Sequence, residues 1–116
     1  MIIFRSSFRD KGAKQKISKV IEIAQEAVSV QIAKDSNRFI PKDYGNLEAS
    51  VFADSDFQAG RIVWGVEYAV YVYYKRSLNL SKDKNPQASH LWFEVAKSRY
   101  LADWLEVGQN VVNQKI

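Results

Sequence analysis

Apolar residues recur at intervals of three and four positions over residues 14–37, which is the spacing of one face of a helix. The pattern predicts a long helix in the first third of the chain. Ile23 and Val30 lie off this face, so a second apolar surface is covered either within the domain or by another subunit. The predicted buried face consists of Ile17, Val20, Ile21, Ala24, Ala27, Val28 and Ile32.

The segment after this helix has the composition of a rigid corner. Pro41 lacks the amide hydrogen that would extend the helix, and Gly45 can adopt a positive φ. Asp43 can accept hydrogen bonds from the amides that follow it, and Asn46 is suited to cap a short turn over residues 47–50. The predicted structural corner, to which we assign a positioning role, consists of Pro41, Asp43, Gly45, Asn46, Leu47 and Ser50.

Several segments have the residue types of strands. Residues 51–53 and 61–66 predict a hairpin, with the Asp-, Ser- and Gly-rich residues 54–60 as its loop. Residues 67–75 are interpreted as a strand from their β-branched and aromatic residues, although Tyr68, Tyr71 and Val72 also fit helical spacing. Ile2 to Arg5 is either a short edge strand or part of a mobile arm over residues 1–12.

The last part of the chain predicts an exposed loop and a second long helix. Residues 77–88 are polar and irregular, and Ser89 is suited to cap a helix that runs from His90 to Val107. Gly108 is expected to end this helix and to leave residues 109–116 as a frayed tail. The predicted buried side consists of Leu91, Trp92, Val95, Ala96, Ala102, Trp104 and Leu105.

Together these elements predict a single α+β domain over residues 1–116, in which a long N-terminal helix and a C-terminal helix pack on one face of a small antiparallel sheet. With 116 residues, 47% of them apolar, the chain can form one hydrophobic core. No apolar run approaches the roughly 20 residues of a membrane helix, so we expect a protein that remains in the cytoplasm where it is made.

The charge of +4 is unevenly distributed. Residues 1–19 hold six Lys and Arg against one Asp, and a second basic group follows the tyrosine-rich segment. These groups are either a solvated surface or a contact for a polyanion, and the tyrosines suit core packing, a protein interface or base stacking. The candidate interface residues are Tyr68, Tyr71, Tyr73, Tyr74, Lys75, Arg76, Lys82 and Lys84.

No motif in the sequence predicts catalysis, a cofactor or a metal site. Cysteine is absent, which excludes disulfides and thiolate chemistry. His90 is the single histidine and is interpreted as a capping or surface residue. Asp54 and Asp56 lack the further ligands of a calcium loop, so we assign them to turn formation.

Three motifs resemble those of a known family. Pro41-Lys-Asp-Tyr-Gly-Asn-Leu-Glu-Ala-Ser50 is similar to the "Pro-x-Asp-Thr-Gly-x-Leu-x-x-Ser" signature of the minor capsid and neck proteins of long-tailed phages, with Tyr44 in place of threonine. Residues 62–69, Ile-Val-Trp-Gly-Val-Glu-Tyr-Ala, resemble that family's strand ending in an aromatic-alanine pair. Residues 85–94 resemble its "Asn-Pro-x-Ala-x-x-x-Trp-Phe" entry into the last helix.

The resemblance implies a structural protein of the virion or prophage that joins the head to the tail and acts by binding in a ring. The implied partners are other copies of the chain, the portal or connector, and the tail-terminator protein, with a possible passing contact to packaged DNA. The implied location is the head–tail junction, and the host cytoplasm during assembly. A small basic DNA-binding protein is the alternative that the two basic groups leave open.

Overall fold

The computed structural model describes residues 1–5, 15–42, 46–75, 80, 82 and 84–115, with the backbone alone at residues 15 and 16. Helices predominate among these residues, and two short strands complete the fold. In chain order, the elements are β1 (Ile2–Arg5), α1 (Gln15–Asn37), α2 (Leu47–Asp54), β2 (Arg61–Trp64), α3 (Ala69–Tyr74) and α4 (Trp92–Lys115).

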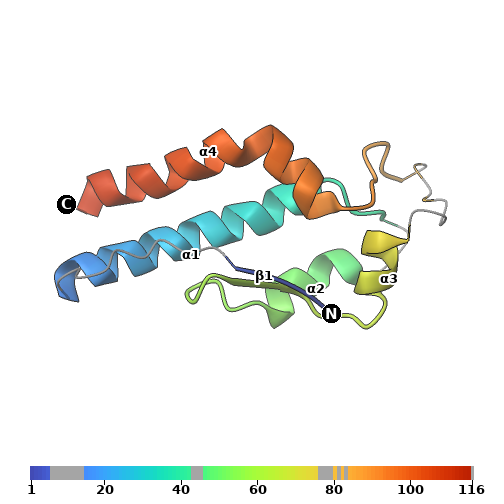
Figure 1. The fold of residues 1–116 in the computed structure, drawn as a ribbon, viewed down its shortest axis with the longest axis horizontal. Coiled ribbons are helices and arrows are strands. Elements are labelled where there is room, and N and C mark those ends of the chain that lie inside the picture. Colours follow the sequence, from blue (N-terminus) through green and yellow to red (C-terminus); the bar gives the residue numbers. More distant parts are fainter. Residues whose placement is uncertain (6–14, 43–45, 76–79, 81, 83, 116) are drawn as a thin grey trace.

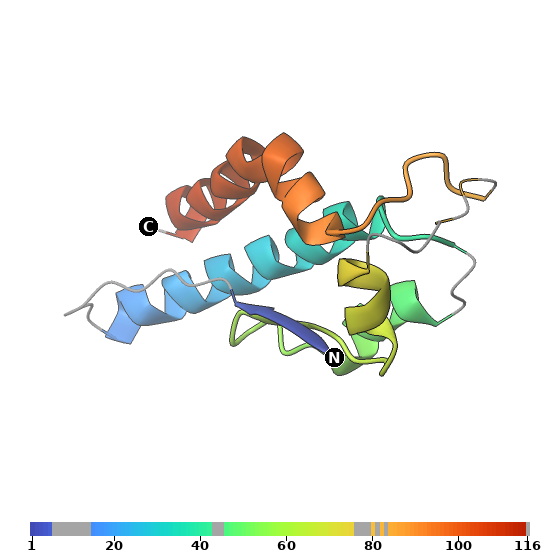
Figure 2. The same cartoon turned by 45° about the vertical axis from the view of Figure 1, so that its right-hand side comes forward.

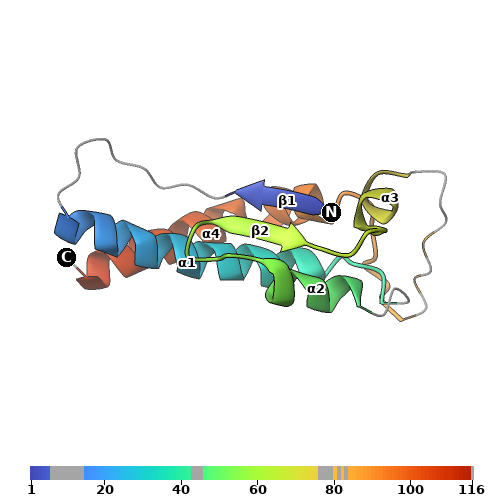
Figure 3. The same ribbon diagram turned by 90° about the horizontal axis from the view of Figure 1, so that it is seen from below.

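The two long helices, α1 and α4, run antiparallel along the long axis of the molecule, on the same side of the sheet (Figures 1 and 3). Helices α2 and α3 are short and lie toward the same end of the molecule, near the end of α1 and the start of α4 (Figure 2). The molecule measures 49 × 25 × 19 Å along its principal axes. This arrangement confirms the predicted α+β class, the long first helix and the C-terminal helix.

The sheet consists of β1 and β2 alone among the described residues. The strands are antiparallel, with Ile2 opposite Trp64 and Arg5 opposite Arg61. Ile2 and Trp64 are buried on the helix side, while Arg5 is exposed. The structure therefore has a strand at Ile2–Arg5, where the sequence left a strand and a mobile arm open.

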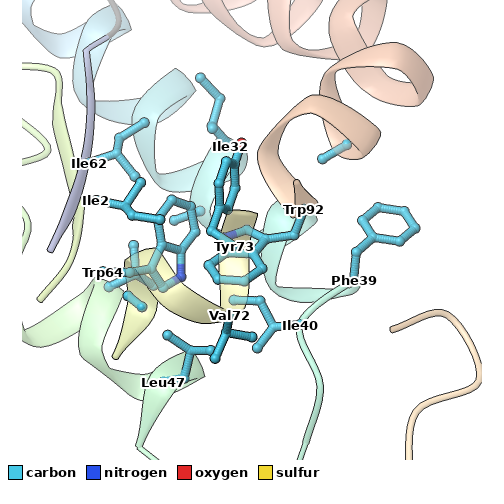
Figure 4. Close-up of a cluster of buried hydrophobic side chains, with 14 of the residues drawn as sticks. Ile2, Ile32, Phe39, Ile40, Leu47, Ile62, Trp64, Val72, Tyr73 and Trp92 are labelled. Atoms are coloured by element: carbon cyan, nitrogen blue, oxygen red, sulfur yellow. The ribbon is translucent and has the colours of Figure 1, made fainter. Parts of the chain in front are cut away.

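The core lies between the sheet, α3 and the facing ends of α1 and α4 (Figure 4). Its largest fully buried side chains are Trp64, Trp92 and Tyr73. The Tyr73 and Trp92 rings meet edge to face, with centroids 4.7 Å apart. Phe4 of β1 stacks on Phe93 of α4 at 4.1 Å, which joins the edge strand to the last helix. Such contacts between rings contribute about 0.5–1.5 kcal/mol beyond the burial of their area.

The predicted hairpin is wrong in its first strand. Residues 51–53 belong to α2, and β2 pairs instead with β1, which is more than 50 residues away in the sequence. Leu47, Ser50 and Val51 are the buried residues of α2, and their spacing is helical. The expected turn is found close to its predicted place, because Asp56 and Arg61 form a bridge and Gly60 has a φ of 75°.

The preferred strand over residues 67–75 is also wrong, since Ala69–Tyr74 form α3. The buried residues of α3 are Ala69, Val72 and Tyr73, spaced three and four apart. β-branched and aromatic residues favour a half-buried pleated surface on average, but here the spacing of the buried positions decided the structure.

The last helix begins and ends later than predicted. It runs from Trp92 to Lys115, so Gly108 does not end it and residues 109–115 are helical rather than frayed. One interior glycine costs only about 1 kcal/mol relative to alanine, which neighbouring packing outweighs. Ser89 does not cap it, because its hydroxyl donates to the carbonyl of His90. Ala102 and Leu105 are exposed, contrary to the predicted buried side.

Candidate functional site: the corner and the surface of α3

The corner is held by two buried asparagine side chains. Asn37, at the end of α1, accepts a hydrogen bond of 3.0 Å from the indole nitrogen of Trp64 and donates one of 3.0 Å to the carbonyl of Glu48. Asn85 donates to the carbonyls of Arg38, at 3.0 Å, and Ile40, at 2.8 Å. The chain leaving α1 is thus fixed on both sides, by β2 and α2 and by the segment before α4.

Some of the predicted corner residues have the structural role that the sequence indicated. Pro41, Leu47 and Ser50 are buried, and the Ser50 hydroxyl donates to the Leu47 carbonyl at 2.7 Å. Asn46 occupies the N-cap position of α2, as predicted, but its side chain makes no capping hydrogen bond. Its backbone carbonyl accepts from the amide of Ser50 at 3.0 Å instead. Asp43 and Gly45 lie outside the described residues.

A buried carboxylate joins the two long helices. Asp35 is 3% exposed and accepts hydrogen bonds from Trp104 of α4 at 2.8 Å, from Arg38 at 3.1 Å and from Gln31 at 3.2 Å. A buried charge is tolerated when it is paired and hydrogen-bonded, and both conditions hold here. Asp35 therefore fixes α4 against the end of α1.

Helix α3 is anchored to the start of α4 through its last carbonyls. The Nδ1 atom of His90 lies 2.8 Å from the carbonyl of Val72, and the amide of Leu91 donates to the carbonyl of Tyr73 at 3.1 Å. Leu91 has a φ of 51°, a left-handed conformation that is strained for a residue with a Cβ atom. His90 thus positions α3, a role that differs from the predicted cap.

Tyr73 belongs to the core and not to the candidate interface. Its side chain is 1% exposed and packs against Trp92 and Phe4. Burial, reinforced by the negative charge of Glu94, raises the pKa of Tyr73 well above its ordinary value. The hydroxyl therefore remains protonated at any physiological pH.

Four other side chains of this segment form an exposed apolar surface, which we call the α3 surface. It consists of Tyr68, Val70, Tyr71 and Tyr74, which are 39% to 60% exposed. Large apolar side chains gathered on one short helix differ from the scattered exposed residues of an ordinary surface. The centroids of the buried Tyr73 ring and the exposed Tyr74 ring lie 4.8 Å apart, so the α3 surface packs on a side chain of the core.

One basic residue, Lys75, borders the α3 surface. Lys75 is exposed, and its Nζ atom lies 5.3 Å from the centroid of the Tyr71 ring, a cation–π distance. Lys82 and Lys84 are exposed in the segment before α4. Arg76 lies outside the described residues. The structure thus brings part of the predicted basic group next to the exposed tyrosines.

Two residues of this site were not predicted as such. Asn37 and Asn85 fix the corner, although the sequence pattern pointed to residues 41–50 for that role. The Asn85-Pro86 pair was a usable signal, because an asparagine before a proline favours a turn in which its side chain bonds the backbone. Asn37 gave no local signal, since its partners, Trp64 and Glu48, are distant in sequence.

Within the described part of the chain, no three His, Asp or Glu side chains gather in a way that could hold a metal ion. None of the helices described there is both long enough and apolar enough to span a bilayer.

Comparison with known families identifies one match over most of the chain. The family described as "Minor capsid protein" matches residues 6–111. No match was found among curated proteins or among solved structures. The matched range includes the corner, the α3 surface and most of α4. The chain therefore belongs to the phage minor capsid protein family, whose members are structural components of the virion.

Proposed function

We propose that this protein joins the head of a long-tailed phage to its tail, by binding as one copy of a ring at the head–tail junction. Its partners are neighbouring copies, the portal or connector, and the tail-terminator protein. It acts through binding and catalyses no reaction. The family membership supports a particle protein, and the motifs over residues 41–50, 62–69 and 85–94 support the junction.

The observation that carries this proposal is the α3 surface. Tyr71 and Tyr74 are 50% and 60% exposed, although tyrosine rings contribute strongly when buried at protein interfaces. The core contacts of Tyr73 and the hydrogen bonds from residues 90 and 91 hold the helix in place. A surface that is rigid before binding loses less conformational entropy when a partner covers it.

A closed ring of identical subunits uses a head-to-tail interface, which needs two different patches on each subunit. The α3 surface supplies one patch of this proposal. Leu101 and Leu105 of α4 supply the second, since they lie one helical turn apart and are 44% and 56% exposed. Neither leucine was assigned to an interface from the sequence.

The test is a phage that carries Tyr71→Ala with Tyr74→Ala. We expect the isolated protein to fold normally and heads to accumulate without tails, because the substitutions remove only exposed rings. Phe52→Ala is the matched control, since Phe52 is an aromatic residue of similar exposure, 48%, on α2. Normal particles from the double variant would contradict a role for the α3 surface.

DNA binding is the second candidate, and it is favoured by Lys75 beside the exposed ring of Tyr71 and by Lys82, which is exposed in the segment before α4. Binding to phosphates releases condensed counterions, so affinity would fall steeply as salt rises. A gel-shift series in increasing salt, with Lys75→Glu and Lys82→Glu together as the variant, separates the two candidates. Absence of binding at low salt rules out this alternative.

A further inference from the structure

The two edges of the small sheet differ in whether their backbone groups have hydrogen-bond partners, and the edge of β2 has them. The backbone amide of Val63 donates to the Ser55 hydroxyl at 2.8 Å, and that hydroxyl lies 3.3 Å from the Val63 carbonyl. The amide and carbonyl of Arg61 bond the carbonyl and amide of Asp56 at 2.8 and 2.9 Å. The outer edge of β2 is therefore closed by the chain that precedes it.

The same bonds fix the orientation of β1. Because Arg61 and Val63 direct their backbone groups away from β1, the groups of Ile62 and Trp64 point toward it. In an antiparallel pair, two directly opposite residues direct their backbone groups either toward each other or both away from each other. Ile3 faces Val63 and Arg5 faces Arg61, so both direct their amides and carbonyls to the outer edge of β1.

Nothing in the described part of the chain pairs with that edge, since the sheet has the order β1-β2 and no other strand. In Figure 3, β1 forms one border of the sheet while β2 lies between it and α2. Unpaired backbone groups on an edge strand form a template for a further strand. β1 is only four residues long and ends on the charged Arg5, but it includes neither proline nor lysine, so its outer edge is only partly protected.

The side chains at this edge specify what could bind. Ile3 is 42% exposed and Met1 58% exposed, which provides apolar contacts next to the backbone groups. Arg5 and Arg61 are directly opposite each other, and no ion pair among the described residues neutralises either of them. Like charges placed opposite each other on a sheet are destabilising, so an acidic neighbour would relieve their repulsion.

We propose that the outer edge of β1 receives an extended, acidic strand from another protein of the particle. Main-chain hydrogen bonds to Ile3 and Arg5 would provide affinity, and a carboxylate near Arg5 and Arg61 would provide selectivity. The proposal rests on the proposed function only in locating the donor in the particle. The α3 surface is a separate contact, made by side chains instead of backbone groups.

The test uses the full chain, labelled with ¹⁵N, and a short synthetic peptide that alternates valine with glutamate. Amide signals of Ile3 and Arg5 should shift on titration, because their hydrogens become bonded. A peptide that alternates valine with lysine should bind about tenfold more weakly, because its charges face two arginines. Absence of shifts in β1, or equal binding of both peptides, would overturn the proposal.

Ile3→Pro is the informative variant, since it removes an outward amide hydrogen at a position where an edge strand tolerates proline. It should fold and lose peptide binding, while Ile3→Ala keeps the amide and retains binding. Equal binding by both variants would also overturn the proposal. So would a dimer, measured by sedimentation without peptide, that Ile3→Pro abolishes, because the occupant would then be a second copy. None of these results depends on where the protein acts in the particle.

Discussion

The indole nitrogen of Trp104 donates a hydrogen bond of 2.8 Å to the buried carboxylate of Asp35, and so ties α4 to the end of α1. Trp64 makes an equivalent bond to Asn37, whereas the indole nitrogen of Trp92 has no partner among the described residues. All three rings are almost fully buried. Substitutions of these three tryptophans can therefore distinguish the contribution of the hydrogen bond to stability from that of ring packing.

Trp104→Phe and Trp64→Phe should each lower the free energy of unfolding by about 1–3 kcal/mol more than Trp92→Phe, because each removes the indole donor of a buried acceptor, Asp35 or Asn37. Urea unfolding of the three variants measures the difference. Trp92→Phe is the matched control, since it loses a similar ring area and no hydrogen bond. Equal losses in all three would show that these bonds do not hold the helices together.

Asn85→Ala should lower the free energy of unfolding by about 2–4 kcal/mol, because it leaves the carbonyls of Arg38 and Ile40 without their donor. Gln87→Ala is the control, since its side chain is exposed and should change stability by no more than about 0.5 kcal/mol. Thermal or urea unfolding gives both values. A variant of Asn85 as stable as the control would contradict the role assigned to it in the corner.

Leu91→Gly should be more stable than Leu91→Ala by about 1–2 kcal/mol, because only glycine adopts a φ of 51° without a clash of its Cβ atom. Both variants remove the same leucine packing, so their difference isolates the backbone. In a helix interior, by contrast, the alanine variant is more stable than the glycine variant. A more stable alanine variant, measured by urea unfolding, would show that Leu91 is not strained.

The alkaline limb of the stability curve should depend on Tyr73. Its pKa is raised in the folded state above the unfolded value of 10.0, so the unfolded chain loses the proton first and stability falls as the pH rises above that value. Tyr73→Phe should match the parent at pH 8 and exceed it by about 1 kcal/mol at pH 11. Tyr74→Phe removes an exposed hydroxyl and is the control. Identical pH profiles for the parent and Tyr73→Phe would contradict the burial of this hydroxyl.

The sequence predicted the features that depend on local patterns. The spacing of apolar residues located α1 within one residue at its start, and the residue types of β2 predicted a strand. The helix α3 was missed because tyrosine and valine favour strands on average, whereas Val72 and Tyr73 became buried on one side of a helix. Tertiary packing thus outweighed intrinsic preference.

The rest depended on contacts between distant residues. No local pattern indicates that Ile2 pairs with Trp64, or that Asn85 bonds the carbonyl of Ile40. The candidate interface was predicted in part, since Tyr71 and Tyr74 are exposed while Tyr73 is in the core. Which tyrosine of three neighbours is buried follows from the direction of each side chain on α3, and the strand interpretation gave the wrong direction.

Electron microscopy of particles made without this gene tests the central claim most directly. A head–tail joining protein is needed after each part has been built, so its loss should leave both parts intact but separate. We predict DNA-filled or leaking heads beside complete, unattached tails, with normal particles restored by the gene in trans. Intact infectious particles without the gene would contradict a role in joining the head to the tail.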